Sequence, residues 1–221
     1  MTLAIFDLDN TLLAGDSDYL WGLYHSEGGI VDRDVYERLN ERFYRDYTEG
    51  RLDILEFLRF SLRPLRDNRL EDLLRWRREF ITEKIAPIIL PRARALVERH
   101  RASGDTLLII TATNEFVTSP IAECFGVANL IGTVPEQVNG RYTGAVAGVP
   151  SFQAGKVKRL DQWLAASGED LAGSTFYSDS HNDLPLLERV DHPVAVDPDG
   201  ELARRAAARG WPVISLRKAP D

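Results

Sequence analysis

From about residue 91 onward, short apolar stretches typical of buried β-strands alternate with stretches that have the spacing of amphipathic helices. This alternation predicts a parallel sheet covered by helices, because parallel strands need a crossover connection. The strands are expected at Thr106–Thr111, Leu130–Val134, Ser174–Ser178, Val194–Asp197 and Val213–Leu216. The intervening helices are expected at Arg92–Arg101, Glu115–Phe125, Gly155–Ala166, Leu184–Val190 and Glu201–Arg209.

The first strand of this sheet is expected much earlier, at residues 3–7, where the chain is mostly apolar. Between residue 16 and about residue 86, apolar side chains recur at helical spacing and strand signals are almost absent. We therefore expect a Rossmann-like α/β core made of residues 1–15 and 87–221. A helical domain of residues 16–86 is expected as an insertion after the first strand.

A small β-flap is expected within the core at residues 134–147. The pair Asn139-Gly140 lies between Val138 and Tyr142, which is the pattern of a tight hairpin turn. In open α/β sheets, ligands bind at the carboxyl ends of the strands. The residues that follow each strand are therefore the first place to look for a functional site.

The composition limits the classes of function that the chain can have. No apolar run approaches the ~20 residues that cross a bilayer. The N-terminus lacks a basic stretch followed by an apolar segment, so a cytoplasmic location without a membrane partner is expected. The net charge is −7 and Lys and Arg form no dense run, so nucleic acid is not an expected partner.

The single cysteine, Cys124, excludes an internal disulfide and fits a reducing compartment. It lies in an amphipathic stretch, so it is interpreted as a small core residue rather than a nucleophile. Nothing in the sequence indicates the oligomeric state.

An acidic motif, D-L-D-N-T, follows the first strand and contains Asp7, Asp9 and Thr11. A spacing of two residues directs both carboxylates to the same side of an extended backbone. A turn is the alternative interpretation, because Asp and Asn are common in turns and Thr11 could cap the next segment. Alone, the motif leaves both interpretations open.

A hydroxyl stands where the second strand is expected to end, at Thr111, and Ala112 follows it. A hydroxyl and successive backbone amides at such a position can receive phosphate oxygens, especially where a helix begins. The alternative is an ordinary helix cap, with Thr113 or Asn114 starting the helix.

A lysine, Lys156, follows Gly155 where another helix is expected to begin. Most lysines in such places are solvated surface residues, and that interpretation also stays open. Lys158 and Arg159 are close enough in sequence to compete for any role that needs a basic group.

Residues 178–183, S-D-S-H-N-D, form the strongest polar cluster and again follow an apolar strand. Asp179 and Asp183 supply two more carboxylates. His181 suggests a general base or a metal ligand, although a histidine in a neighbouring loop is more often a bystander.

The four strand ends of a parallel sheet gather along one edge, so these clusters are expected to converge. Acidic groups that converge repel one another unless a cation lies among them. Oxygen ligands without a Cys or a pair of His favour a hard ion, and Mg²⁺ is the expected one. The metal and Lys156 together would make an anion pocket in an acidic protein.

These motifs resemble those of the haloacid dehalogenase superfamily of phosphohydrolases. D-L-D-N-T is similar to its first motif, Thr111 to its second, Lys156 to its third and S-D-S-H-N-D to its fourth, over residues 3 to about 197. The helical insertion lies where the phosphoserine-phosphatase-like branch, subfamily IB, has its cap. The resemblance implies a Mg²⁺-dependent phosphatase with a helical cap that acts on a small phosphorylated metabolite.

The resemblance also implies a role for each catalytic residue. Asp7 would be the nucleophile that forms an aspartyl-phosphate, and Asp9 would be the general acid and then the general base. Thr111, Ala112 and Lys156 would bind the transferring phosphoryl group. Lys156 would also restrain Asp7.

A metal site follows from the same resemblance. Mg²⁺ would be held by Asp7, Asp9 and Asp179, and in the family the backbone carbonyl at the Asp9 position is a ligand. Asn182 and Asp183 would support the site.

The chain departs from the phosphoserine phosphatases beside the second motif and in the cap. Those enzymes usually have glycines where Ala112 and Thr113 follow Thr111. Their cap has an acidic residue near the position of Asp16, which is a shorter acid and a candidate specificity residue.

Those enzymes also have a cap arginine that grips the substrate carboxylate. Here that position falls on Phe60 or Ser61, flanked by Arg59 and Arg63. Phosphoserine is therefore doubtful as the substrate, and histidinol phosphate is another candidate.

Other functions remain to be weighed against a phosphatase. A phosphotransferase of the same fold would pass the phosphoryl group to an alcohol. A phospho-aspartate receiver module would also place Asp and Lys around Mg²⁺, but it offers no counterpart to Asp9. Dehalogenase chemistry needs neither a metal nor an acid at that position.

Overall fold

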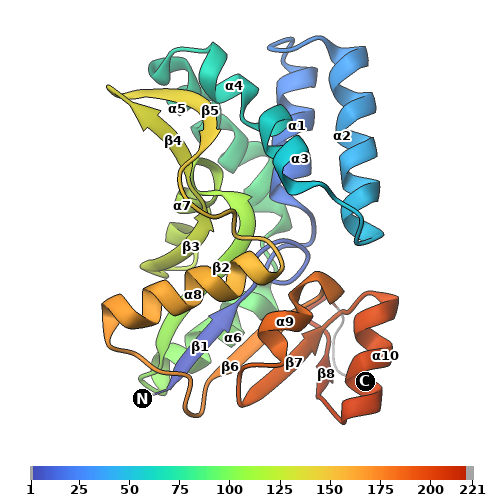
Figure 1. The fold of residues 1–221 in the computed structure, drawn as a ribbon, viewed down its shortest axis with the longest axis vertical. Coiled ribbons are helices and arrows are strands. Elements are labelled where there is room, and N and C mark those ends of the chain that lie inside the picture. The colour runs from blue at the N-terminus through green and yellow to red at the C-terminus, as the bar shows by residue number, and fades with distance from the viewer. Residues whose placement is uncertain (1, 218–221) are drawn as a thin grey trace.

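The computed structural model describes residues 2–217. Six parallel strands form the central sheet in the order β3-β2-β1-β6-β7-β8 (Figure 1), which confirms the predicted fold class. The strands are β1 Leu3–Phe6, β2 Thr106–Asn114, β3 Asn129–Thr133, β6 Thr175–Ser178, β7 His192–Val196 and β8 Val213–Ile214.

The central strand β1 explains why the sheet has two covered faces. All four of its residues are buried, and successive side chains point to opposite faces. Ala4 and Phe6 join one hydrophobic cluster, whereas Leu3 and Ile5 join the other. A strand without a polar side must be buried on both faces, so it takes the middle of the sheet.

Helices from different parts of the chain cover the two faces. Residues of α6 (Pro91–Ala102) and α7 (Glu115–Cys124) pack in the cluster that contains Phe6. Residues of α8 (Ala154–Ser167), α9 (Leu184–Leu187) and α10 (Gly200–Arg209) pack in the cluster that contains Ile5. This two-sided covering arises because strands are added to one side of β1 as β2 and β3 and then to the other side as β6, β7 and β8, and crossovers of the same right-handed sense then place their helices on opposite faces.

Helices also fill the segment between β1 and α6, and they stand above the sheet in Figure 1. They are α1 Ser17–Glu27, α2 Arg33–Thr48, α3 Ile54–Ser61, α4 Arg63–Asp67, α5 Leu70–Phe80, the π-helical turn η1 Ile81–Ile85 and the 3₁₀ turn η2 Ala86–Ile88. Asp16, Asp32 and Asp53 cap α1, α2 and α3, because each carboxylate accepts a hydrogen bond from a backbone N–H of the first turn.

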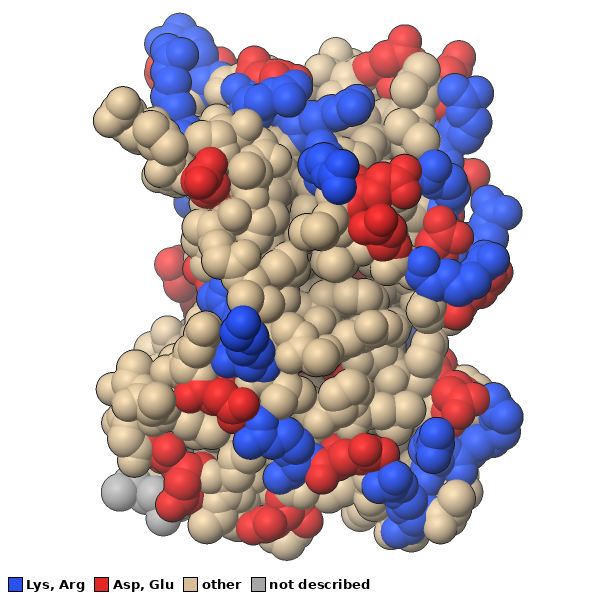
Figure 2. All heavy atoms as spheres, viewed as in Figure 1, with Lys and Arg blue, Asp and Glu red and all other residues tan. Residues whose placement is uncertain are grey.

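A hairpin of β4 (Pro135–Val138) and β5 (Arg141–Val146) forms where the β-flap was expected, with Asn139 and Gly140 both at positive φ. It packs against α3 and α4. On the face of the molecule that Figure 2 shows, basic and acidic side chains are interspersed at both ends. Mostly uncharged atoms lie at the narrower middle, between the helical insertion and the sheet.

Some local details differ from the sequence-based expectations. Strand β2 continues to Asn114 instead of ending at Thr111, and Cys124 is only half-buried rather than part of the core. A further short helix, α4, which the sequence pattern does not separate, spans Arg63–Asp67 between α3 and α5. No helix in the described part of the chain is long and apolar enough to cross a membrane.

A histidine is buried without a polar partner in α1. His25 is 0% exposed, and neither ring nitrogen has a hydrogen-bond partner among residues 2–217. Its ring meets the Trp21 ring at a centroid distance of 4.1 Å. Burial lowers the pKa of His25 from 6.5 to about 3. The folded chain therefore keeps this side chain neutral at pH values where the unfolded chain protonates it.

This difference makes the free energy of unfolding depend on pH. Below pH 6.5 the unfolded state binds a proton at His25 that the folded state does not bind, so stability falls as the pH falls. We expect His25→Leu to remove this contribution. The stability of the variant relative to the native chain should then rise by about 2 kcal/mol between pH 7 and pH 5.

Urea unfolding at several pH values measures this difference. His192→Gln, at an exposed position on β7, is the matched control and should follow the native pH profile. A difference between His25→Leu and the native chain that stays constant with pH would contradict the assignment.

Candidate active site

The carboxyl ends of β1, β2 and β6 lie next to one another, because β1 pairs in parallel with both of the other strands. Phe6 is aligned with Ile109 on one side and with Tyr177 on the other. Asp7, Thr111 and Asp179 each follow one of these aligned positions closely. The acidic motif, the hydroxyl and the second acidic cluster therefore converge at one edge of the sheet, as the sequence predicted.

Lys156 lies inside this cluster and is 3% exposed, so the surface-lysine interpretation is wrong. Its Nζ donates to Asp7 Oδ1 at 2.7 Å and to Asp183 Oδ2 at 2.9 Å. Burial acts to lower the pKa of Lys156, but the charges of Asp183 and Asp7 outweigh it and raise the pKa above its ordinary value. Lys156 is therefore a permanent cation between two carboxylates.

The local backbone explains how Lys156 reaches this position from the start of α8. A Cβ at Gly155 would lie 2.1 Å from the carbonyl oxygen of Pro150, so only glycine fits there. Gln153, just before α8, has a positive φ of 48°, and its Nε2 donates to Asn182 Oδ1 at 2.9 Å. This tight turn joins the start of α8 to the S-D-S-H-N-D loop.

Asp183 is held from the other side by β6. The hydroxyl of Ser178 donates to Asp183 Oδ2 at 2.7 Å, and both residues are buried. Asp183 thus binds Lys156 with an already oriented carboxylate.

Asp9 points away from Lys156, toward the beginning of the helical insertion. Its Oδ1 accepts from the backbone N–H of Ser17 at 2.6 Å. Its Oδ2 accepts from the hydroxyl of Thr113 at 2.8 Å and from that of Thr111 at 3.2 Å. Three donors orient this carboxylate, and one of them belongs to the first residue of α1.

Sequence reasoning missed the role of Thr113. From the sequence, Thr113 is expected to start a helix or to stand where related enzymes have a glycine, but in the structure Asn114 caps α7 and the Thr113 hydroxyl donates to Asp9. The alternation of Thr111 and Thr113 on an extended strand was the available signal, because residues two apart share a face.

Thr11 links the two acidic clusters. Its hydroxyl lies 3.2 Å from Asp7 Oδ2 and 3.0 Å from Asp179 Oδ1, and it accepts from the backbone N–H of Asp179 at 3.0 Å. Burial raises the pKa of Asp7 to about 7, with Lys156 opposing and Asp183 adding to the shift. Burial and the charge of Asp7 raise the pKa of Asp179 well above its usual range.

The cluster therefore holds three carboxylates, of Asp7, Asp179 and Asp183, but one lysine, which contacts Asp7 and Asp183, and the excess negative charge suits a cation. Within residues 2–217, no three His, Cys, Asp or Glu side chains have the spacing of a complete metal site. The carboxylate of Asp9 is already bound to Ser17, Thr111 and Thr113. Asp7 and Asp179 thus fit a hard cation that takes its remaining oxygens from the backbone or from water.

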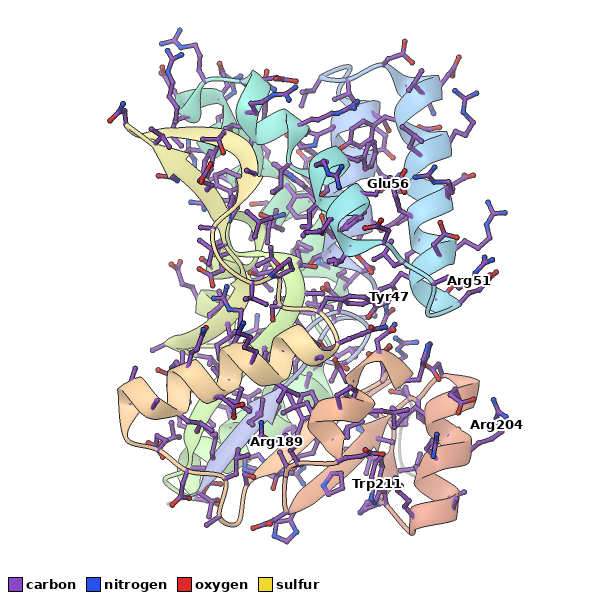
Figure 3. The ribbon with its side chains drawn as sticks, viewed as in Figure 1. Tyr47, Arg51, Glu56, Arg189, Arg204 and Trp211 are labelled. Atoms are coloured by element: carbon purple, nitrogen blue, oxygen red, sulfur yellow. The ribbon has the colours of Figure 1, made fainter. Side chains whose placement is uncertain are left out.

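A pocket opens on Asp7 between the sheet edge and the helical insertion. Aromatic and aliphatic side chains of the insertion form much of its wall, including Tyr19, Phe43, Tyr44, Tyr47, Leu52 and Phe57. Figure 3 shows Tyr47 at the waist between α2 and the core. Of the aromatic residues near the first motif, Tyr19 lines the pocket, whereas Trp21 lies in the core.

The charged groups of the pocket wall are all acidic. Besides Asp7 and Asp9, the wall contains Asp16 and Asp18, and none of its described residues is a Lys, Arg or His. Burial raises the pKa of Asp16 well above its usual range, and the charge of Asp9 adds to this shift. The pocket therefore disfavours an anionic group away from Lys156 and favours a cationic one.

The residues at the position where phosphoserine phosphatases have a substrate-binding arginine do not line the pocket. Phe60 and Ser61 are buried in the helical insertion, and neither they nor Arg59 and Arg63 are among the residues that line the pocket.

His181 lies outside the pocket. Its Nδ1 is 2.8 Å from Asp199 Oδ2, and it lines a separate hollow with Thr48 and Gly50. Asn182, beside it, donates to the backbone carbonyl of Tyr47 at 3.1 Å. This loop therefore contacts the end of α2.

Comparison with protein families and curated proteins gives consistent matches. Residues 4–188 match the family model described as haloacid dehalogenase-like hydrolase. A histidinol-phosphatase of Neisseria meningitidis serogroup C (strain 8013) is 51% identical over 219 residues, covering 97% of this chain and 99% of that protein. A phosphoserine phosphatase of Mycobacterium tuberculosis is 32% identical, covering 98% of this chain and 71% of that protein.

Solved structures resemble the whole chain. A protein of unknown function from Bordetella pertussis Tohama I has a TM-score of 0.92 and 44% identity, covering 98% of this chain and 100% of that one. A phosphoserine phosphatase solved as a phospho-aspartyl intermediate analogue has a TM-score of 0.72, covering 98% and 94% of the two chains. Its identity is 16%, so this second likeness concerns the fold alone.

The buried position of Lys156 leads to a prediction about stability. Lys156→Met leaves Asp7 and Asp183 buried without a cation, and we expect the free energy of unfolding to fall by about 3–5 kcal/mol. Lys158→Met, on the exposed side of the same helix, should change it by less than about 0.5 kcal/mol. Chemical denaturation of both variants measures the difference, and equal stabilities would contradict the buried ion pair.

Proposed function

Since the chain belongs to the haloacid dehalogenase-like hydrolases and is a phosphatase for small phosphorylated metabolites, we propose that it hydrolyses histidinol phosphate through Asp7 with the help of Mg²⁺. The observation that supports this substrate most is the pocket beside Asp7, whose charged wall residues are acidic. The relative that is 51% identical over nearly the full length of both chains bears the name histidinol-phosphatase.

The substrate chemistry matches the charges of the pocket. The alcohol part of histidinol phosphate has an amine and an imidazole and has no carboxylate. Phosphoserine would bring a carboxylate next to Asp16 and Asp18, with no basic side chain among the described wall residues to receive it. An amine instead forms a favourable pair with an acid such as Asp16.

In the proposed first step, a carboxylate oxygen of Asp7 attacks phosphorus and the bond between phosphorus and the ester oxygen breaks. Lys156 holds the other part of the Asp7 carboxylate and keeps it oriented. Asp9 gives a proton to the leaving oxygen, so the alcohol departs neutral. The product of this step is an aspartyl-phosphate at Asp7.

In the second step, water attacks phosphorus and the bond to Asp7 breaks. Asp9, now a carboxylate, takes the proton of the attacking water, which restores both residues and releases inorganic phosphate. Ser17 and Thr113 hold Asp9 in one orientation for both transfers. An oriented acid is what distinguishes this site from a receiver module, which keeps its phosphoryl group.

The phosphoryl oxygens are bound at the end of β2 and the start of α8. Thr111 and Ala112 line the pocket beside Asp7, and Lys156 adds the positive charge. Phosphoryl transfer depends mainly on positioning and on neutralising charge. These groups supply both functions.

The oxygen-rich cluster would hold Mg²⁺ through Asp7, Asp179 and the backbone carbonyl of Asp9, with Asp183 and Asn182 as supporting residues. When bound, the ion neutralises the carboxylates and the phosphoryl oxygens. The helical segment 16–86 serves as a cap, because its side chains close the pocket and exclude water from the bond that breaks.

Two substitutions test the catalytic roles. Asp7→Asn removes the nucleophile and should lower phosphate release from histidinol phosphate by at least about 10³-fold. Asp9→Asn keeps the nucleophile but removes the proton transfer, and should lower it by about 10²–10⁴-fold. Phosphate release by the purified protein with Mg²⁺ measures both effects. Faster release from phosphoserine than from histidinol phosphate by the native chain would refute the proposed substrate.

Metal binding is tested without measuring activity. Mg²⁺ at 100 times its dissociation constant should raise the melting temperature of the native chain by roughly 5–10 °C. Asp179→Asn should remove most of this rise. In the presence of a chelator, the Asp179→Asn variant should be at least as stable as the native chain, because the substitution removes a negative charge that is buried beside Asp7. Asp34→Asn, an exposed acid on α2, should keep the native response.

A further inference from the structure

One acid of the pocket has no hydrogen-bond or ion-pair partner among residues 2–217. Asp18, the second residue of α1, is 9% exposed and lines the pocket. No hydrogen bond or ion pair joins its carboxylate to any residue that the structure describes, in contrast to Asp16, which accepts from Tyr19 N at 2.8 Å. Burial and the charge of Asp9 raise the pKa of Asp18 to about 7. A buried carboxylate without a partner destabilises the fold, so it calls for a ligand that pairs with it.

The two acids lie at the start of α1, on either side of the residue that binds Asp9. Asp16 is the N-cap of α1, and Asp18 is the second residue of the helix. Between them, the backbone N–H of Ser17 donates to Asp9 Oδ1 at 2.6 Å.

The direction of α1 shows which acid lies farther from the chemistry. The helix begins beside Asp9 and runs into the helical insertion above the sheet (Figure 1). Asp18 therefore lies farther along α1 from Asp9 than Asp16 does, by about 3 Å along the helix axis.

We propose that Asp18 is a specificity-determining residue that binds the imidazole of the leaving group, an inference that rests on the proposed function. In histidinol phosphate the amine is two carbons from the ester oxygen, and the imidazole lies beyond it. With the phosphate at Asp7, the amine falls near Asp16 and the ring reaches toward Asp18. A protonated imidazole supplies the N–H donor and the positive charge that Asp18 lacks, and the aromatic wall offers faces against which the ring can lie.

A pair of substrates isolates this contact. Histidinol phosphate and phenylalaninol phosphate have the same phosphate and the same amine, but only the first has a ring that donates a hydrogen bond. We expect the native chain to prefer histidinol phosphate in kcat/KM. Asp18→Asn should lower kcat/KM for histidinol phosphate by about 10–100-fold, mainly through KM, and change that for phenylalaninol phosphate by less than about 2-fold.

Two further variants serve as controls. Asp34→Asn removes the same charge at an exposed site and should leave both substrates unaffected. Asp16→Asn should lower kcat/KM for both substrates alike, because both have the amine.

The outcomes separate the inference from the proposed function. If the native chain cleaves histidinol phosphate and Asp18→Asn affects both substrates equally, or neither, the role of Asp18 is wrong and the proposed activity stands. If the native chain cleaves other phosphate esters but not histidinol phosphate, the proposed substrate is wrong, and the role of Asp18 falls with it.

Discussion

The site depends on one buried cation, Lys156, placed between Asp7 and Asp183. The three residues come from the start of α8, the end of β1 and the loop after β6, so this contact joins segments far apart in sequence. Taking carboxylates out of water costs several kcal/mol each unless a positive charge compensates. The sheet edge can therefore collect acidic groups only because the turn before α8 delivers a lysine to its centre. The same contact orients Asp7.

The pocket beyond Asp7 has the opposite electrostatic character, because its charged wall residues are acidic. In the proposed binding mode, the phosphate lies at Asp7 beside Lys156, and the cationic part of the substrate lies near Asp16 and Asp18. Charge would then orient such a substrate before any close contact forms. A substrate with a carboxylate on its leaving group would be disfavoured without any steric clash, because its negative charge would lie unpaired beside Asp16 and Asp18. The helical insertion supplies this second half of the recognition.

The sequence predicted those parts of the site that depend on local pattern. Asp7, Thr111 and Asp179 follow apolar strands, and parallel strands bring such residues together whatever the details of packing. Contacts between side chains that are far apart in sequence could not be predicted, because a sequence pattern does not show in which direction each side chain points. The bond from Thr113 to Asp9 and the unpartnered carboxylate of Asp18 belong to this second class. Likewise, periodicity indicated the helices of the insertion, but it did not indicate which of their faces would form the pocket wall.

The hydrogen bond from Ser17 N to Asp9 has a mechanical consequence. Because this amide belongs to the first residue of α1, any displacement of α1 from the sheet edge would remove one of the three donors that orient Asp9. A single backbone amide thus couples the position of the helical insertion to the orientation of a carboxylate in the core.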